Sequence, residues 1–339
     1  MSKYEVEVHN NFDSHDHSEW DDFVNESPQG NIFCRSWWLE AVCPKGFEIL
    51  VLRNGGRIVA GMPLVRSRKL GREAIHMPKL TQILGVLLAP PTGQKYEKRL
   101  SSEMDVLREL VQAIPPVDYF SMNFHHSFTN WLPFYWAGYK QTTQYTYVIP
   151  DLADLDKVFS EFSYSKKKNI KKAERLVSVR EDLSASDFYA NHVYTLRKQG
   201  GQISYSFDHF KRIYDAAHRE KCGKSWYAID SKKNIHAVIF VVFDNKSAYY
   251  LISTIDPDFR NSGAATLLLR DAITYVSQHT NRFDFEGSMI PGVENSFRKF
   301  GAIQTPYFSI TKANLLGKTW RMLRPYVGRF ARAFRSRRW

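Results

Sequence analysis

A turn of small residues between a strand and a helix is the most specific chemical signal in the sequence. Asp258-Phe259-Arg260-Asn261-Ser262-Gly263-Ala264-Ala265 lies between the apolar stretch AYYLIST and the amphipathic stretch ATLLLRDAITYV. A helix that begins in this way leaves backbone N–H groups unpaired at the positive end of its dipole, where they can bind a pyrophosphate. The segment from Arg260 to Ala265 is therefore a candidate phosphate-binding turn, although an ordinary strand-to-helix turn has the same pattern.

Two acidic residues, two positions apart, form the second signal. Phe283-Asp284-Phe285-Glu286-Gly287-Ser288 has the alternation of a strand, in which every second residue shares a face at a separation of about 7 Å. Asp284 and Glu286 are then predicted on one face, with both phenylalanines packed behind them. Such a pair can supply a general base and an orienting carboxylate. Two acids on a solvated edge strand would show the same pattern.

The third signal is the basic stretch YSKKKNIKKAER over residues 164–175. Four of its basic residues follow the spacing of one helix face: Lys168, Lys171, Lys172 and Arg175. Repulsion between these charges is costly unless an anion offsets it. Lys167, Lys168 and Lys171 are therefore candidate contacts for an anionic acceptor, and a solvated basic face is the alternative.

Length and composition exclude a single small module and a wholly disordered chain. The chain has 339 residues, 43% hydrophobic and 24% charged, which suits a folded protein of about two domains. The net charge is +12, of which residues 313–339 carry +8 and residues 163–175 carry +5, so the remainder sums to −1. Two basic patches on a nearly neutral body indicate an anionic partner.

Cysteines, histidines and the N-terminus point to the cytoplasm and to no metal. The three cysteines are odd in number, and neither they nor the histidines have partners at metal-ligand spacing, so we predict no disulfide framework and no metal site. The start MSKYEVEVHN lacks the apolar core of a signal peptide, and no apolar run is long enough to cross a bilayer. Walker-type and Gly-x-Ser-x-Gly motifs are absent from the sequence.

The elements that must position these residues fall into two similar α/β halves. In the first we expect a strand at residues 4–8, two short helices before Pro44, a hairpin around Asn54-Gly55-Gly56, a helix over residues 96–114 and further strands up to Pro150. The second has predicted helices at 154–175, 186–199 and 207–220, then the strands WYAID, HAVIFVVF and AYYLIST, a helix from Gly263, and the strands RFDFEG and YFSITK. We therefore predict an α/β protein with domains at 1–150 and 151–312.

Residues 313–339 are predicted to form a separate basic, amphipathic helix. Apolar residues recur at steps of four and three: Leu316, Trp320, Leu323, Val327, Phe330 and Phe334. Arginines flank this stripe, as in helices that lie in an anionic membrane interface, and Pro325 should kink the helix. We therefore expect peripheral attachment at the cytoplasmic face of a membrane. A helix docked on the body and a disordered nucleic-acid-binding tail are the alternatives.

Taken together, these motifs resemble the Fem-type branch of the GNAT acyltransferase superfamily over about residues 30–312. KKKNIKKAERLVSV is similar to the basic helix of that branch, and RFDFEGSMIPGVENSFRKFGA resembles its closing signature. NIFCRSWWLEAV and GRIVAGMPL are placed as in relatives that carry two tandem GNAT-like folds. The resemblance implies two mixed-sheet GNAT-like domains, the second of them catalytic.

The resemblance also implies transfer of an acyl group from acyl-CoA to an amine. Arg260-x-x-Gly263-x-Ala265 resembles the family's acyl-CoA pyrophosphate motif. Glu286 first, and Asp284 second, would take the proton of the amine, and Tyr250 is a candidate proton donor to the leaving thiolate. The acceptor would be an anionic, envelope-related or lipid-linked molecule. A transferase that uses aminoacyl-tRNA, with tRNA as partner, and a non-catalytic membrane-surface binding protein on the same fold are the alternatives.

Overall fold

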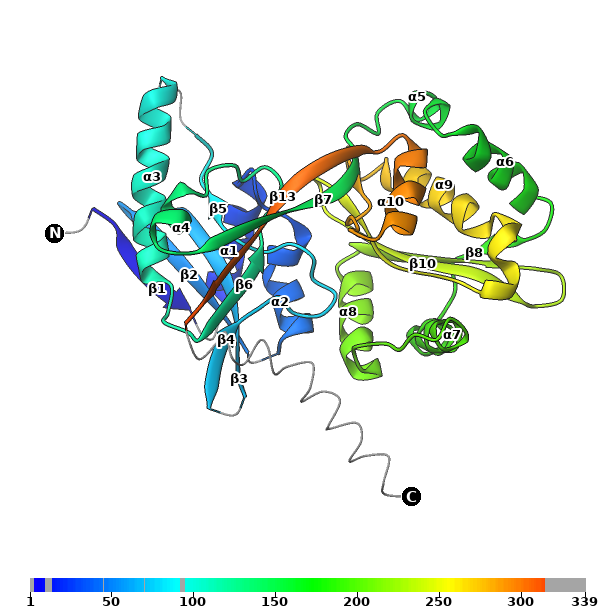
Figure 1. The fold of residues 1–339 in the computed structure, drawn as a ribbon, viewed down its shortest axis with the longest axis horizontal. Helices are drawn as coiled ribbons and strands as arrows, with labels where there is room; N and C mark the ends of the chain where they lie inside the picture. Colours follow the sequence, from blue (N-terminus) through cyan, green and yellow to red (C-terminus); the bar gives the residue numbers. More distant parts are fainter. Residues whose placement is uncertain (1–2, 10–13, 45, 70, 92–94, 315–339) are drawn as a thin grey trace, which may run out of the picture.

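Twelve strands follow one another across a single mixed sheet that runs through both halves of the molecule (Figure 1). The computed structural model describes residues 3–9, 14–44, 46–69, 71–91 and 95–314. The strands lie in the order β1-β2-β3-β4-β6-β13-β7-β12-β11-β10-β9-β8, with β5 paired to β3 off this path. Helices cover the sheet, and the predicted mixed α/β class is confirmed.

The first half has its strands at β1 (Glu5–His9), β2 (Phe47–Asn54), β3 (Arg57–Lys69), β4 (Arg72–Ile75), β5 (Leu87–Leu88), β6 (Tyr119–Asn123) and β7 (Lys140–Ile149). Its helices are α1 (Ser14–Glu26), α2 (Ser36–Val42), α3 (Tyr96–Ala113) and α4 (Leu132–Trp136), with a 3-10 turn at Ile32–Cys34. The hairpin predicted between β2 and β3 is confirmed. Both of its central glycines have positive φ, +57° and +76°, as the tight turn requires.

The second half has its strands at β8 (Ser178–Arg180), β9 (Gly223–Ile229), β10 (Ile235–Phe243), β11 (Ala248–Ile255), β12 (Phe283–Asp284) and β13 (Ile303–Ala313). Its helices are α5 (Leu155–Ser160), α6 (Tyr164–Ala173), α7 (Ala185–Lys198), α8 (Phe207–Arg219), α9 (Ala264–Val276) and α10 (Pro291–Phe297). Two 3-10 turns lie at Pro257–Ser262 and Arg298–Phe300. The single helix expected over 154–175 is wrong, because the chain turns after α5 and Ser163 caps a new helix at the N–H of Lys166.

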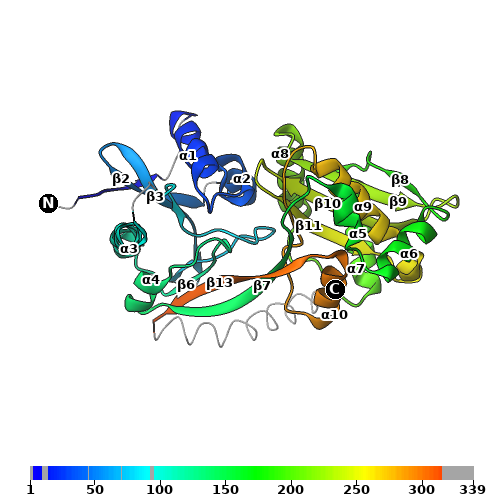
Figure 2. The same cartoon turned by 90° about the horizontal axis from the view of Figure 1, so that it is seen from above.

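The last strand of the described chain returns to the first half. β13 pairs antiparallel with β7 from Ile303↔Val148 to Thr311↔Lys140, and its other edge pairs with β6. Figure 2 shows β6, β13 and β7 running together along one side of the molecule, from the first half toward the second. The segment predicted as the end of the second domain therefore lies between two strands of the first, and both halves share one hydrogen-bonded sheet.

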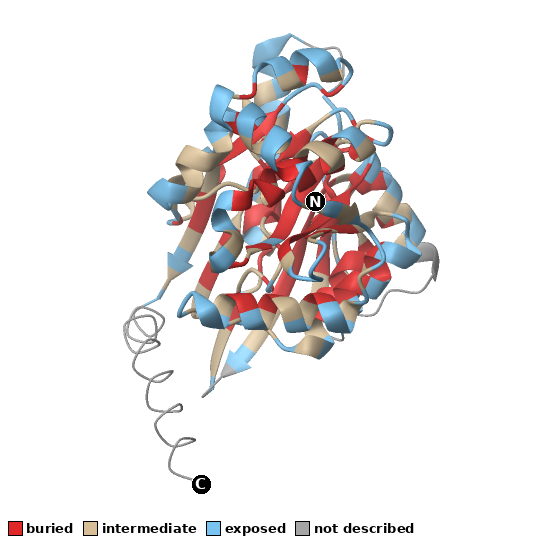
Figure 3. Cartoon of the chain, turned by 90° about the vertical axis from the view of Figure 1, so that its right-hand side faces the viewer, coloured by how far each residue is buried: buried red, intermediate tan, exposed pale blue. Residues whose placement is uncertain are grey.

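The hydrophobic core also crosses between the halves. Figure 3 shows the buried residues along the middle of the sheet and the exposed ones on the outer faces of the helices. In the larger of two core clusters, Phe33 from the first half lies 4.8 Å from Tyr249 of β11 between ring centroids. Phe188 and Phe210, from α7 and α8, belong to the same cluster. Apolar burial therefore holds the two halves in one arrangement.

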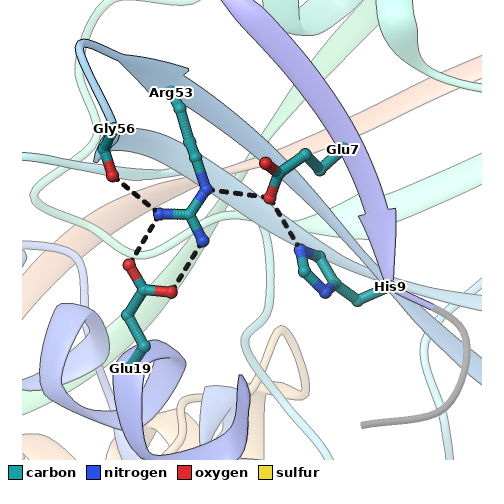
Figure 4. Close-up of polar contacts among 5 residues, drawn as sticks. All are labelled: Glu7, His9, Glu19, Arg53 and Gly56. Atoms are coloured by element: carbon teal, nitrogen blue, oxygen red, sulfur yellow. Dashed lines mark hydrogen bonds and ion pairs between the residues drawn. The ribbon is translucent and has the colours of Figure 1, made fainter. Parts of the chain in front are cut away.

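Strand β1 is fastened to the edge of the sheet by one arginine (Figure 4). The Arg53 guanidinium donates to both carboxylate oxygens of Glu19 at 2.6 Å, to Glu7 at 2.8 Å and to the Gly56 carbonyl at 3.0 Å. His9 contacts the same Glu7 oxygen. Since Glu19 lies on α1 and Glu7 on β1, this fork-shaped donor joins a helix, a strand and a hairpin.

In the part of the chain that the structure describes, no helix is both long and apolar enough to span a membrane. The membrane-binding helix predicted within 313–339 lies outside the described residues from position 315 onward.

Candidate active site

Strands β11 and β12 pair only briefly and then separate. They are parallel over two residue pairs, Ala248↔Phe283 and Tyr249↔Asp284. β11 continues to Ile255, whereas the chain after β12 turns toward β7, where the Phe285 N–H donates to the Tyr147 carbonyl at 2.9 Å. In the described sheet, the edge of β11 beyond Tyr249 therefore has no strand beside it on the β12 side. The acidic pair stands at one end of this edge and the small-residue turn at the other.

The acidic pair does not have the predicted geometry. β12 ends at Asp284, and Glu286 lies beyond it with φ +58°, so the expected strand alternation is wrong. Gly287 follows with φ +66°, and a Cβ there would lie 2.1 Å from the Tyr145 carbonyl oxygen. The chain turns sharply because it approaches β7 closely. The turn nevertheless brings the two acids together, since the Glu286 N–H donates to Asp284 Oδ1 at 2.7 Å.

Burial sets the protonation of both carboxyl groups. Asp284 is 1% exposed, and burial raises its pKa to about 6 against the opposing hydrogen bonds from Thr146 and the Glu286 N–H. Burial and the charge of Asp284 hold the pKa of Glu286 well above its usual range, and a hydrogen bond with Gln82 acts in the opposite direction. A raised pKa makes the ionised carboxylate a stronger base.

Glu286 has an oxygen that faces no donor. Its Oε1 is buried and has no hydrogen-bond partner among the described residues. No basic side chain of the described residues contributes to the shift in the pKa of Glu286. Asp284 does feel the charge of Arg282, whose guanidinium contacts His126 Nε2 at 3.4 Å. Among the described residues, the Glu286 carboxyl group thus lacks a hydrogen-bond donor at Oε1 and a neighbouring positive charge, and a substrate amine provides both.

Sequence reasoning missed the contribution of the first half to this pair. Thr146 on β7 donates to Asp284 Oδ1, and Gln82 in the loop before β5 acts to lower the pKa of Glu286. Tyr307 on β13 donates to Gln144 at 2.8 Å, and burial together with the charges of both acids raises its pKa to about 12. No local motif marks these residues. They come from β7, the loop before β5 and β13, which are far apart in the sequence and meet the acidic pair only in the folded chain.

The predicted phosphate-binding turn forms the start of α9. Arg260 and Asn261 are exposed, Ala265 is half-buried, and Ser262, Gly263 and Ala264 are buried. Gly263 has φ +84°, and the Ala264 N–H after it is held by Ser262 Oγ at 3.2 Å. The end of α7 supports the turn, since Lys198 Nζ lies 2.6 Å from carboxylate oxygens of both Asp256 and Asp258.

Helix α6 lies directly against this turn, which joins two motifs that the sequence presents separately. A Cβ at Gly263 would lie 2.3 Å from the backbone oxygen of Asn169, so only glycine allows this approach. Lys172 Nζ donates to the Asn261 carbonyl at 2.7 Å. Lys168 and Lys171 are exposed, and Lys167 donates to the Ser160 carbonyl at 2.6 Å. The basic face therefore adds positive potential beside the start of α9.

Two further residues have unexpected surroundings. Tyr250 is 9% exposed and packs near Phe285 and Phe297, at 6.1 and 6.2 Å between ring centroids, and burial raises its pKa to about 12. Lys166, which sequence reasoning did not select, is also 9% exposed, with Nζ 3.0 Å from Ser296 Oγ and 3.9 Å from the Phe300 ring centroid. Burial lowers its pKa to about 8. The sequence offered one signal for Lys166, which stands three residues after Ser163, the residue that caps α6.

The second half of the chain resembles a known family in sequence, and the whole described chain resembles solved structures in fold. Residues 160–294 match the family described as Acetyltransferase (GNAT) domain. No curated protein matches the chain. Among solved structures, FemX superimposes with a TM-score of 0.67 at 12% identity, covering 89% of this chain and 96% of that one. A tandem GNAT protein from the clavulanic acid biosynthesis pathway gives 0.52 at 11% identity, covering 91% and 98%.

A conserved protein of unknown function from Bacteroides thetaiotaomicron VPI-5482 has the same architecture, with a TM-score of 0.57 at 10% identity, covering 91% of this chain and 100% of that one. The matched segment runs from α5 to α10 and contains the acidic pair, the turn before α9 and helix α6. The expected resemblance and the tandem fold are confirmed.

Proposed function

We propose that this chain, whose residues 160–294 match the GNAT acetyltransferase domain family and whose fold is similar to that of FemX, transfers an acyl group from acyl-CoA to an amine. One observation carries the proposal: the edge of β11 that is unpaired in the described sheet has a small-residue helix start at one end, and at the other the buried carboxyl group of Asp284 and the half-buried one of Glu286. The first suits the phosphates of the donor, and the second suits the proton of an amine.

In the proposed reaction, the amine nitrogen attacks the thioester carbonyl, a C–N bond forms and the C–S bond breaks. Glu286 takes the proton of the amine at Oε1, and Asp284 orients Glu286 through its backbone N–H. Backbone N–H groups on the free edge of β11 polarise the carbonyl. Tyr250, on the same strand and protonated at neutral pH, is the candidate proton donor to the thiolate.

The test is a transfer assay in which the full chain meets labelled acetyl-CoA and, separately, labelled aminoacyl-tRNA with a panel of amines. We expect transfer and free thiol with acetyl-CoA. Arg260→Glu should raise the KM for acetyl-CoA by about tenfold, because it places a negative charge at the exposed turn. The control Arg219→Glu makes the same charge change at the exposed end of α8. Transfer from aminoacyl-tRNA alone would contradict the choice of donor.

We also propose that Lys167, Lys168 and Lys171 contact an anionic acceptor, such as an envelope-related or lipid-linked molecule. Lys168→Glu/Lys171→Glu should raise the acceptor KM several-fold more than the donor KM, since both side chains are exposed on one helix. Lys232→Glu/Lys233→Glu makes the same charge change at the β9–β10 turn and should leave both constants unchanged. A larger rise in the donor KM would assign α6 to the donor, beside whose turn it lies, and an equal rise in both constants would contradict a specific contact with the acceptor.

For residues 313–339 we propose peripheral attachment to the cytoplasmic face of an anionic membrane. The charge of this segment supports the proposal, since it carries eight basic residues and no acidic ones. The full chain should float with anionic vesicles and less so as salt rises. Truncation after Asn314 preserves β13, including the bond from the Asn314 N–H to the Asp118 carbonyl, and should abolish flotation. Equal flotation of both forms would place the membrane contact elsewhere.

A further inference from the structure

The end of helix α7 meets the turn between β11 and α9. α7 ends at Lys198, and Lys198 Nζ lies 2.6 Å from Asp256 Oδ1 and 2.6 Å from Asp258 Oδ2. The next residue, Gln199, donates from Nε2 to the Ile255 carbonyl at 2.9 Å. Two consecutive side chains at the end of α7 therefore hold the last residue of β11 and the first part of the turn that follows it.

Of the two carboxylates that Lys198 contacts, Asp256 is the more important. The Asp256 side chain is 8% exposed, whereas that of Asp258 is 68% exposed. Water screens an exposed ion pair, which then contributes little, but a buried carboxylate is costly unless a cation offsets its charge. Among the described residues, Lys198 is the one basic side chain that forms an ion pair with Asp256. Lys198 therefore balances a buried charge at the beginning of the turn.

The Asp256 carboxylate also shapes the turn. Asp256 caps the 3-10 turn Pro257–Ser262, since its Oδ1 accepts from the Asp258 N–H at 3.0 Å and its carbonyl accepts from the Phe259 N–H at 3.0 Å. The same Oδ1 accepts from Lys198 Nζ. A shift of this carboxylate would move the first residues of the turn, and with them the candidate phosphate-binding residues that follow.

Strand β10 supports the same turn through a ring contact. The Phe259 ring stacks on the His236 ring, with 3.9 Å between the centroids and 8° between the planes. The Asp256 N–H donates to the His236 carbonyl at 3.0 Å, and His236 Nε2 lies 3.3 Å from Asp230 Oδ2. The turn is thus supported by β10 as well as by α7, and its conformation is set before a ligand arrives.

We propose that Lys198 is a positioning residue for the acyl donor: by fixing Asp256, it holds the turn from Arg260 to Ala265 in the conformation that binds the phosphates of the donor. This inference rests on the proposed function. A site whose backbone N–H groups are already aligned need not be ordered when the ligand binds, which favours binding. Lys198 contacts the turn and not the acidic pair, so its loss should weaken donor binding and spare the chemical step.

The test is Lys198→Met, which keeps an unbranched side chain and removes the ammonium group. We expect the Kd for CoA, measured by isothermal titration calorimetry, to rise about tenfold, with kcat at saturating acetyl-CoA unchanged. Lys198→Arg keeps the charge and should restore most of the affinity. Lys211→Met is the matched control, because it removes an exposed ion pair with Asp215 on α8.

Two further measurements separate an effect on the turn from a general effect on the fold. Asp256→Asn removes the same ion pair, while its amide oxygen can still accept from the Asp258 N–H. It should also raise the Kd for CoA, and Lys198→Met should then cause little further loss in that background. Asp256→Asn carries the test if thermal melts show that Lys198→Met does not fold. With S-acetyl-N-acetylcysteamine, a thioester without phosphates, kcat/KM should be the same for the wild type and Lys198→Met.

The outcomes distinguish this inference from the function on which it rests. If the wild-type chain does not bind CoA, the proposed donor fails and this inference fails with it. If the wild type binds CoA and Lys198→Met binds it with the same Kd, the positioning role of Lys198 is overturned and the proposed reaction stands. Equal losses of kcat/KM with acetyl-CoA and with the phosphate-free thioester would also overturn it, because they would show an effect that does not depend on the phosphates.

Discussion

Glu286→Gln should lower kcat by about 10²-fold or more, with little change in the KM for the donor. Glutamine keeps the shape of the side chain but has no basic oxygen, so the proton of the amine loses its acceptor. The effect should be large because Oε1 is buried, and water has little room to replace the carboxylate there. Single-turnover measurement with saturating acetyl-CoA and amine isolates the chemical step.

The pH dependence of the activity tests the role of Glu286 in a second way. A base must be ionised, and burial together with Asp284 raises the pKa of Glu286, so wild-type activity should rise with pH through this raised value. Glu286→Gln should remove that limb. The control Glu97→Gln changes an exposed carboxylate on α3 and should alter neither rate nor profile. A Glu286→Gln enzyme with wild-type kcat across the whole pH range would assign the base elsewhere.

Gly263→Ala should destabilise the protein by about 2–4 kcal/mol, from a left-handed residue and an overpacked contact together. Gly263 has φ +84°, and the new Cβ would lie 2.3 Å from the backbone oxygen of Asn169. Either α6 or the start of α9 must move. The free energy of unfolding follows from urea denaturation monitored by circular dichroism.

Gly200→Ala separates the two causes. Gly200 also has positive φ, +74°, but a Cβ there would meet nothing within 4 Å, so we expect a loss of only about 1 kcal/mol. Because Gly263→Ala also displaces the turn from α6, it should weaken the binding of acetyl-CoA, whereas Gly200→Ala should leave binding unchanged. Equal losses of stability in the two variants would show that the contact with Asn169 is not tight.

The sequence was sufficient wherever a signal is local. The glycine pair between β2 and β3, the capped helices α7 and α8, and the helix start at Gly263 were all predictable, because turn conformation, capping and amphipathic spacing act over a few residues. The same holds for the composition of the candidate site. The acidic pair, the basic helix and the small-residue turn could each be recognised as a short pattern of suitable chemistry.

Only the tertiary structure decided how these patterns meet. Glu286 lies in a left-handed turn because the backbone at Gly287 approaches β7, a strand about 140 positions earlier in the chain. Helix α6 reaches the start of α9 because Gly263 lacks a side chain, and Tyr307 comes under the influence of both acids because β13 pairs with β7. Contacts between distant segments depend on the packing of the whole chain, and no local spacing records them.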